Sequence, residues 1–462
     1  MTRFSRIVQL KVHDLPLMKS QSTPMIFRFP SRPAEEDPIV ITGIGMAASV
    51  GSSRESVWKA VQSGRSGIRL TTASDNVGPL ELPCGMVDWL PDHHQSLKSV
   101  QISERIAAEA LDDAEIQWPS VDRERFACSV SAQFGDIGYL FPERAISDAA
   151  TGRQWWREFL PCSASQIVAK RFDLRGPRLC HATACASGLI STIVAARMLQ
   201  MDQADYALCG AADAVTDLCF AAFHRMGVLA RGPEPATACR PFDVTREGFV
   251  MGEGGAMLVL ERRSHAVERG AKIYAELAAS QTLCQAHHVT GLDGEAETLT
   301  RLIQDLVRKA GWDYRGPQYI NAHGTGTEQN DISELKAIRA ALQSQADDLV
   351  VSSNKAILGH TINAAGSLEL ALTAMSLRDG FAPPTMHLTQ PESVGNIDCL
   401  PEYGEQRELD RALKLSLAFG GHLVGVAIRR CPLDDFQRPA EPLAPSARIR
   451  EPAAARLVRK AA

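Results

Sequence analysis

Three short stretches of this 462-residue chain each place a reactive side chain just beyond an apolar run. The first reads HATACASGL and contains Cys185, directly before a predicted helix at 188–201 that is apolar almost all round and therefore buried. The unpaired N–H groups and the positive dipole end of a helix start favour thiolate over thiol, which makes Cys185 a candidate nucleophile. An inert, buried cysteine is the alternative. Gly188 permits a tight helix start and a close approach of the chain.

The other two stretches each carry a histidine in a loop that follows a predicted strand. His323 lies in NAHGTGTEQNDISE, where glycines flank a threonine and let backbone and hydroxyls approach an extended polar ligand. A phosphate loop is a rival interpretation, but the stretch lacks the spacing and the lysine of a Walker loop. Lys355 and His360 share a loop in VSSNKAILGHTINAAGSLE, and Glu369 lies on the helix after it. If Lys355 and Glu369 are buried, each needs the other, because a lone buried charge is costly.

One thiol at a helix start and two histidines on separate loops together indicate acyl chemistry through a thioester. No carboxylate pair fits glycoside hydrolysis. The glycine-rich residues 252–255 precede a predicted strand, which is the wrong order for a dinucleotide-binding loop. Cys180 lies five residues before Cys185, yet no second Cys/His pair at zinc spacing accompanies it. We therefore expect no metal.

The composition excludes several classes of protein. With 45% hydrophobic and 22% charged residues, the chain is neither disordered nor a coiled coil, and its 11 cysteines are too sparse for a disulfide-stapled mini-protein. A net charge of −5 argues against a nucleic-acid binder, which usually carries a basic face. No run reaches the ~18 apolar residues of a membrane span, and the N-terminus lacks the long apolar core of a secretory signal. We expect a cytoplasmic protein with free thiols.

Short apolar runs alternate with helical stretches, which predicts an α/β fold with largely parallel, buried sheets. In such sheets the carboxyl ends of the strands gather the functional side chains. A hairpin is predicted from residues 414–419 and 423–429 around Gly420 and Gly421, and a helix begins near residue 55. Further strands are predicted at residues 39–50, 177–184, 206–212, 256–260, 318–322 and 350–353, with another starting at 272.

The pattern also divides the chain. Residues 1–37 are expected to be a flexible N-terminal extension, and the Pro-, Ala- and Arg-rich residues 433–462 a disordered tail. A charged stretch near residues 261–271 is the expected boundary between two halves of similar size, 38–265 and 266–432.

These motifs resemble the β-ketoacyl-acyl-carrier-protein synthases of the thiolase superfamily, specifically the elongating Cys-His-His type. The resemblance covers about residues 38–431 and rests on VITGIGMAASVG, TACASG, RPFDVTREGFVMGEGGAMLVLE, NAHGTGTEQND, SSNKAILGHTINAAGSLE and AFGG, in that order. It implies a five-layer α-β-α-β-α fold built from two related halves, the first carrying the nucleophilic cysteine and the second the catalytic histidines. It also implies a homodimer.

The resemblance implies a role for each reactive residue. Cys185 takes an acyl group from a carrier-protein thioester, and His323 and His360 hydrogen-bond the malonyl thioester carbonyl as carbon dioxide leaves. Decarboxylation develops an enolate oxygen, which two aimed imidazole N–H groups stabilise most in the transition state. The carbanion then attacks the acyl-Cys185 carbonyl, and the product is a 3-oxoacyl-acyl-carrier protein.

Supporting roles follow from the same resemblance. The backbone N–H groups of Cys185 and Phe419 hold the oxyanion, and Lys355 orders the site with Glu369 as its partner. Thr325 and Thr327 contact the pantetheine arm. No cofactor belongs to the enzyme itself, because the phosphopantetheine is carried by the substrate protein. The expected partners are an acyl-carrier protein and its malonyl and acyl thioesters.

Several positions depart from the family pattern and leave the substrate open. Ala418 replaces a glycine of the gate loop and is expected to restrict its motion, while His422 and Leu423 replace small polar residues. Lys98 is the only basic residue of a run, HHQSLKS, in the region that often meets a carrier protein. Fatty-acid elongation is the leading function. The alternatives are a discrete ketosynthase of a specialised lipid or polyketide pathway, a non-catalytic partner subunit, which generally lacks the cysteine, and a thiolase.

Overall fold

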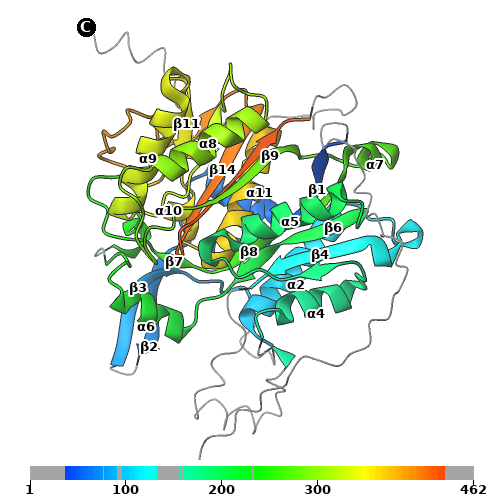
Figure 1. Ribbon diagram of the computed structural model, residues 1–462. Helices are drawn as coiled ribbons and strands as arrows, with labels where there is room; N and C mark the ends of the chain where they lie inside the picture. Colours follow the sequence, from blue (N-terminus) through cyan, green and yellow to red (C-terminus); the bar gives the residue numbers. More distant parts are fainter. Residues whose placement is uncertain are drawn as a thin grey trace, which may run out of the picture. The chain divides into compact units, whose positions relative to one another are not determined.

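A computed structural model describes residues 37–75, 78–90, 96–132, 157–158, 160–231, 234–400 and 402–431, which belong to one compact unit (Figure 1). The expected extension at 1–37, apart from Asp37, and the expected tail at 433–462 lie outside the described residues. Within the described ranges, no helix is both long enough and apolar enough to cross a bilayer.

A ten-stranded sheet runs in the order β11-β10-β14-β15-β9-β1-β8-β6-β4-β5. All ten residues of β1 are buried, so both faces of the sheet must be covered there. The middle pair, β1 and β9, is joined at two residue positions only, which divides the sheet into two five-stranded parts. The strands are β1 (Ile39–Ala48), β4 (Phe126–Ser131), β5 (Arg178–Leu179), β6 (Tyr206–Asp213), β8 (Gly254–Arg262), β9 (Ala275–Cys284), β10 (Tyr319–Asn321), β11 (Val350–Ser352), β14 (Arg411–Ala418) and β15 (His422–Arg429).

Helices cover both parts of the sheet and fill the space between them. The central helices α5 (Ser187–Gln200) and α11 (Ala365–Asp379) are apolar around most of their circumference and contact strands of both parts. Helices α2 (Lys98–Asp113) and α4 (Ser163–Phe172) cover the outer face of one part. The amphipathic α8 (Glu297–Lys309) covers the other, and α9 (Glu328–Leu342) packs on α8. The predicted five-layer α-β-α-β-α fold is confirmed (Figure 1).

The remaining elements are short. The helix predicted near residue 55 is α1 (Arg54–Gln62), which begins after a capping box at Ser53. The expected boundary between the two halves lies within α7 (Arg263–Glu268), and the division itself stays a prediction. The others are α6 (Asp217–Arg225), α10 (Lys355–Leu358), β2 (Arg69–Asp75), β3 (Gly78–Gly85), β7 (Met251–Gly252), β12 (Phe381–Ala382) and β13 (Glu405–Gln406).

The expectation of largely parallel sheets was wrong, because the large sheet is mixed. Parallel pairs occur only toward its two ends, where β10 lies between β11 and β14, and β4 lies between β5 and β6. The five pairs from β14 to β6 are antiparallel. A continuous apolar run indicates that both faces of a strand are buried, but it does not indicate whether the neighbouring strand runs parallel or antiparallel to it.

The strand predicted at 177–184 was also too long. Only Arg178–Leu179 is a strand, and it lies at the edge of the sheet with β4 as its single neighbour among the described residues. The chain then continues irregularly into a 3₁₀ turn at Ala184–Ala186. The predicted hairpin is confirmed: β14 and β15 pair antiparallel from Arg411↔Arg429 to Ala418↔His422.

Candidate active site

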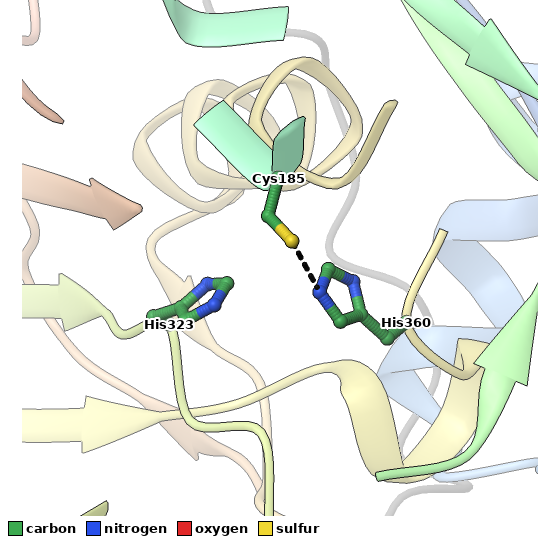
Figure 2. Close-up of side chains that lie close together, drawn as sticks. All are labelled: Cys185, His323 and His360. Carbon is green, nitrogen blue, oxygen red and sulfur yellow. Dashed lines mark hydrogen bonds between the residues drawn. The ribbon is translucent and has the colours of Figure 1, made fainter. Parts of the chain in front are cut away.

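Three reactive side chains that are far apart in the sequence meet at the centre of the fold. Cys185 belongs to the 3₁₀ turn before α5, His323 to the loop after β10, and His360 to the loop after α10. Figure 2 shows the three side chains pointing toward one another. One atom from each lies within 4.8 Å of the others, and His360 Nε2 is 3.1 Å from Cys185 Sγ.

The position of Cys185 depends on a close approach of the two central helices. Its neighbour Ala184 has φ 46°, a left-handed conformation that is uncommon outside glycine. Three residues after Cys185, a Cβ on Gly188 would lie 2.6 Å from the backbone nitrogen of Ser367 in α11. The close approach expected at Gly188 is therefore present, and only glycine allows α5 to carry the cysteine this near to α11.

The protonation state of Cys185 differs from the expected thiolate. Burial raises the pKa of its thiol to about 12, and the nearby Lys355 ammonium lowers it only in part. The resting side chain is therefore the thiol, and a helix start does not by itself overcome the loss of solvent. The expectation failed because sequence shows the helix start but not the depth at which it is buried.

His360 is a neutral imidazole with a defined tautomer. Burial lowers its pKa well below the usual 6.5, helped by the charges of Lys355 and Lys414. Its Nδ1 accepts a hydrogen bond from the backbone N–H of Ile362, 3.2 Å away. The proton of the neutral ring therefore sits on Nε2, and this N–H points at Cys185 Sγ.

His323 is neutral for the same reason, because burial and the charge of Lys355 lower its pKa well below 6.5. Its backbone is held on both sides: the N–H donates to Glu334 Oε1 at 2.6 Å, and the carbonyl accepts from Lys355 Nζ at 2.5 Å. Its buried Nδ1 has no hydrogen-bond partner among the described residues. The ring therefore keeps hydrogen-bonding capacity that a substrate can use.

The structure places Lys355 beside Glu369, with Nζ 2.5 Å from Oε1, and both side chains are buried. It also adds a residue that the sequence interpretation missed. Lys414 on β14 lies with Nζ 2.5 Å from the other carboxylate oxygen, Glu369 Oε2, and is fully buried. A signal was present in the sequence, because a lysine inside the apolar run LKLSL must find a partner if that strand is buried.

The threonine loop is shaped by the helix that follows it. Asp331 on α9 accepts hydrogen bonds from the backbone N–H groups of Thr325 and Gly326, at 3.1 and 3.2 Å. The hydroxyls of Thr325 and Thr327 lie 2.9 Å apart. Thr325 is buried and Thr327 is half-buried. The loop leading away from His323 thus presents two paired hydroxyls, as an extended polar ligand would require.

Phe419 lies at the hairpin turn, where Gly420 and Gly421 adopt φ values of 85° and 76°. The turn is fastened to a neighbouring segment, since the Gly420 N–H donates to Val289 O at 2.7 Å and the Gln285 N–H donates to Gly421 O at 2.9 Å. Ala418 is instead a buried residue of β14 with ordinary strand geometry. The expected restriction of the loop through the φ angle of Ala418 was therefore wrong, because positive φ is needed only at the two glycines.

Lys98 has a structural partner. Its ammonium forms an ion pair with the buried carboxylate of Glu253, which also accepts the backbone N–H groups of Val87 and Val215. The lone lysine of that run is therefore already paired with a carboxylate of the chain itself.

Family models match most of the described chain. Residues 94–266 match the model described as "Beta-ketoacyl synthase, N-terminal domain", and residues 274–389 match "Beta-ketoacyl synthase, C-terminal domain". The chain is 32% identical to a 3-oxoacyl-[acyl-carrier-protein] synthase 2 of Coxiella burnetii, over 84% of this chain and 97% of the relative. It is 34% identical to the tetracenomycin polyketide synthase ketoacyl synthase alpha subunit of Streptomyces glaucescens, over 86% and 97%.

Solved structures of the same kind share the fold. One is a type II polyketide synthase acyl-carrier protein in complex with its ketosynthase bound to the hexaketide, with TM-score 0.78, 27% identity and coverage of 86% of this chain and 100% of that one. Another is the ishigamide ketosynthase/chain length factor, with TM-score 0.76, 27% identity and coverage of 86% and 99%.

Proposed function

Because the chain belongs to the β-ketoacyl synthase family, we propose that it condenses an acyl thioester with malonyl-acyl-carrier protein, with loss of carbon dioxide, to give a 3-oxoacyl-acyl-carrier protein. The observation that carries this proposal is the cluster of Cys185, His323 and His360, with Nε2 of His360 3.1 Å from Sγ. A nucleophilic thiol faced by two neutral imidazoles has the groups that both halves of such a condensation need.

In the first step, Cys185 Sγ attacks the acyl carbonyl of the carrier thioester. The carrier thiol leaves with a proton, and the acyl group remains on sulfur as a new thioester. The His360 N–H directed at Sγ stabilises the thiolate character that this attack requires. The backbone N–H groups of Cys185 and Phe419 are proposed to hold the oxyanion of the tetrahedral intermediate.

In the second step, the malonyl thioester loses its carboxylate as carbon dioxide, and the bonding electrons pass to an enolate. The imidazole N–H groups of His323 and His360 donate to the enolate oxygen, where negative charge develops. The enolate carbon then attacks the acyl carbonyl on Cys185, and the thiolate is the leaving group. Thr325 and Thr327 are proposed to position the pantetheine arm, and the enzyme supplies no cofactor of its own.

Fatty-acid elongation is the function that the relatives named 3-oxoacyl-[acyl-carrier-protein] synthase 2 support. We also propose, from the family, a cytoplasmic homodimer that docks an acyl-carrier protein. A second candidate, a ketosynthase of a polyketide pathway, is favoured by the 34% identity to the tetracenomycin alpha subunit. The gate residues His422 and Leu423, which depart from the elongation pattern, favour it as well.

A reconstituted condensation tests the proposal. The enzyme is incubated with malonyl-acyl-carrier protein and a series of acyl-carrier proteins with saturated chains or with poly-β-keto chains, and the 3-oxoacyl product is measured by mass spectrometry. Extension of saturated chains supports elongation, while extension of poly-β-keto chains alone favours the second candidate. If neither series is extended and malonyl-carrier is not decarboxylated, the proposed function is wrong.

A further inference from the structure

Behind His323 lies a buried charge cluster that contains two lysines. Glu369 is 2% exposed, Lys355 1% and Lys414 0%. The two ammonium groups bind opposite oxygens of the same carboxylate, each at 2.5 Å. One carboxylate between two ammonium groups leaves an excess of positive charge, so a second carboxylate is needed nearby.

Glu334 on α9 provides that second carboxylate. Its oxygens accept the backbone N–H groups of His323 and Gly324, at 2.6 and 2.8 Å. The charge of Lys414 acts on it as a Coulombic neighbour, as does the charge of Asp331. Two cations and two carboxylates therefore form one buried network, and the backbone of His323 is bound by it on both sides.

Lys414 also binds the chain that leads into His323. Its Nζ donates to the carbonyl of Ala322 at 3.0 Å and lies 3.4 Å from the side-chain carbonyl of Asn321. Lys355 Nζ donates to the next carbonyl, that of His323, at 2.5 Å. The ammonium groups of Lys414 and Lys355 thus donate to two consecutive backbone carbonyls just after β10, and both ammonium groups form ion pairs with Glu369.

Building on the proposed function, we propose that Lys414 is a positioning residue for His323, acting through Glu369 and the carbonyl of Ala322 without touching the substrate. A displacement of about 1 Å in a group that must meet developing charge lowers a rate by up to about 10²-fold. This role requires both the charge and the length of the lysine side chain. A neutral side chain of the same length can fill the space, but it cannot bind the carboxylate of Glu369 or the carbonyl of Ala322.

The surroundings of Lys414 make this role sensitive to pH. Burial lowers its pKa to about 8, with the Lys355 charge acting in the same direction and the carboxylates of Glu369 and Glu334 opposing it. The imidazoles of His323 and His360 also face the cluster and stay neutral above pH 6.5, while burial raises the pKa of Glu334 to about 7, so its titration lies below that of Lys414. The charged form of Lys414 is the one that positions His323, so its contribution is present below pH 8 and is lost as pH rises through 8.

The test compares Lys414→Met and Lys414→Arg with the parent enzyme, using release of carbon dioxide from malonyl-acyl-carrier protein across pH 6 to 10. The parent rate should fall as pH rises through about 8. Lys414→Arg should keep its rate there, because a guanidinium stays charged. Lys414→Met should lose roughly 10-fold or more in kcat below about pH 8, with KM little changed, and its rate should approach the parent rate above that pH. Lys59→Met, on the exposed face of α1, is the matched control and should behave as the parent.

Two results would overturn the inference: a Lys414→Met enzyme with the parent rate and pH profile, or a Lys414→Arg enzyme with the same alkaline loss as the parent. If Lys414 were merely structural, its replacement would lower the melting temperature without changing how the rate of carbon dioxide release depends on pH in either variant. If Lys414→Met does not fold, the Lys414→Arg profile alone decides. A parent enzyme that never releases carbon dioxide would instead refute the proposed function.

Discussion

At the scale of single residues, burial decides the protonation of all three reactive groups. It raises the pKa of the Cys185 thiol and lowers the pKa of both imidazoles, so every group is uncharged at neutral pH. Neutral imidazoles are suited to donate hydrogen bonds to an enolate, and a thiol held at 3.1 Å from an imidazole N–H becomes reactive as charge develops on sulfur.

Replacing Cys185 with glutamine separates the two halves of the reaction. Condensation should be abolished, because no acyl group can be attached, while release of carbon dioxide from malonyl-acyl-carrier protein should continue through the two histidines. Mass spectrometry of acylated peptides and a carbon dioxide assay measure the two activities. An acyl group found on another cysteine, with Cys185 unmodified in the parent enzyme, would contradict the assignment.

The histidine variants should give the opposite pattern. In His323→Ala or His360→Ala, decarboxylation should fall by roughly 10²-fold or more, because each removes one donor aimed at developing charge. Acyl transfer to Cys185 should survive better in His323→Ala, since the hydrogen bond to Sγ comes from His360. Single-turnover acylation and carbon dioxide release distinguish these effects. Decarboxylation at the parent rate in both variants would rule out the enolate role.

At the scale of elements, the site depends on how closely α5 crosses α11. Gly188→Ala places a Cβ 2.6 Å from the backbone nitrogen of Ser367, so the helices must separate or the start of α5 must shift. Overpacking of this kind costs about 1–3 kcal/mol, and the shift should also carry Cys185 away from His360. We expect a lower melting temperature and slower acylation. Gly294→Ala, whose Cβ meets nothing within 4 Å, is the control and should change neither.

The hairpin between β14 and β15 gives a second prediction at this scale. Ala418 lies in the strand and is 5% exposed, while the turn takes its shape from Gly420 and Gly421. Ala418→Gly should therefore leave the range of accepted acyl chains unchanged and only lower stability, by about 0.5–1 kcal/mol. Acylation rates across a series of chain lengths measure this. A broader range in the variant would show that Ala418 does control the gate.

At the scale of the whole molecule, the residues of the site come from distant parts of the chain, and these parts pack around one hydrophobic core. A single hydrophobic cluster includes residues of β1, α5, β8, α11 and β15, from both five-stranded parts of the sheet. Cys185 and the two histidines approach one another only if these parts fold together. We therefore expect the active site and the hydrophobic core to unfold in the same transition.

Hydrogen exchange in increasing denaturant checks this cooperativity. Peptides from β8 and β14, in different parts of the sheet, should lose protection with the same denaturant dependence. Leu370→Ala, in the fully buried centre of α11, should destabilise both peptides equally, by about 2–5 kcal/mol. Leu218→Ala, at a residue 44% exposed, should affect neither. Separate transitions for the two peptides would show that the parts are independent domains.

Sequence alone indicated which reactive residues meet at the candidate site and much of what surrounds them. Local patterns carry that information: glycines mark the hairpin turn, apolar runs mark β1 and β6, and the stretches around Cys185, His323 and His360 identify the family. These features depend on residues close together in the chain, so they can be read without knowing what packs against them.

The tertiary structure decided the features that depend on distant neighbours. The mixed strand directions, the thiol state of Cys185, the strand position of Ala418 and the placement of Lys414 beside Glu369 all followed from packing between segments far apart in sequence. The pKa of a buried group depends on the solvent it loses and the charges it meets, and a strand's direction depends on which strands flank it. Neither is encoded within a local stretch, which is why the second lysine behind His323 became visible only once Glu369 and β14 were placed side by side.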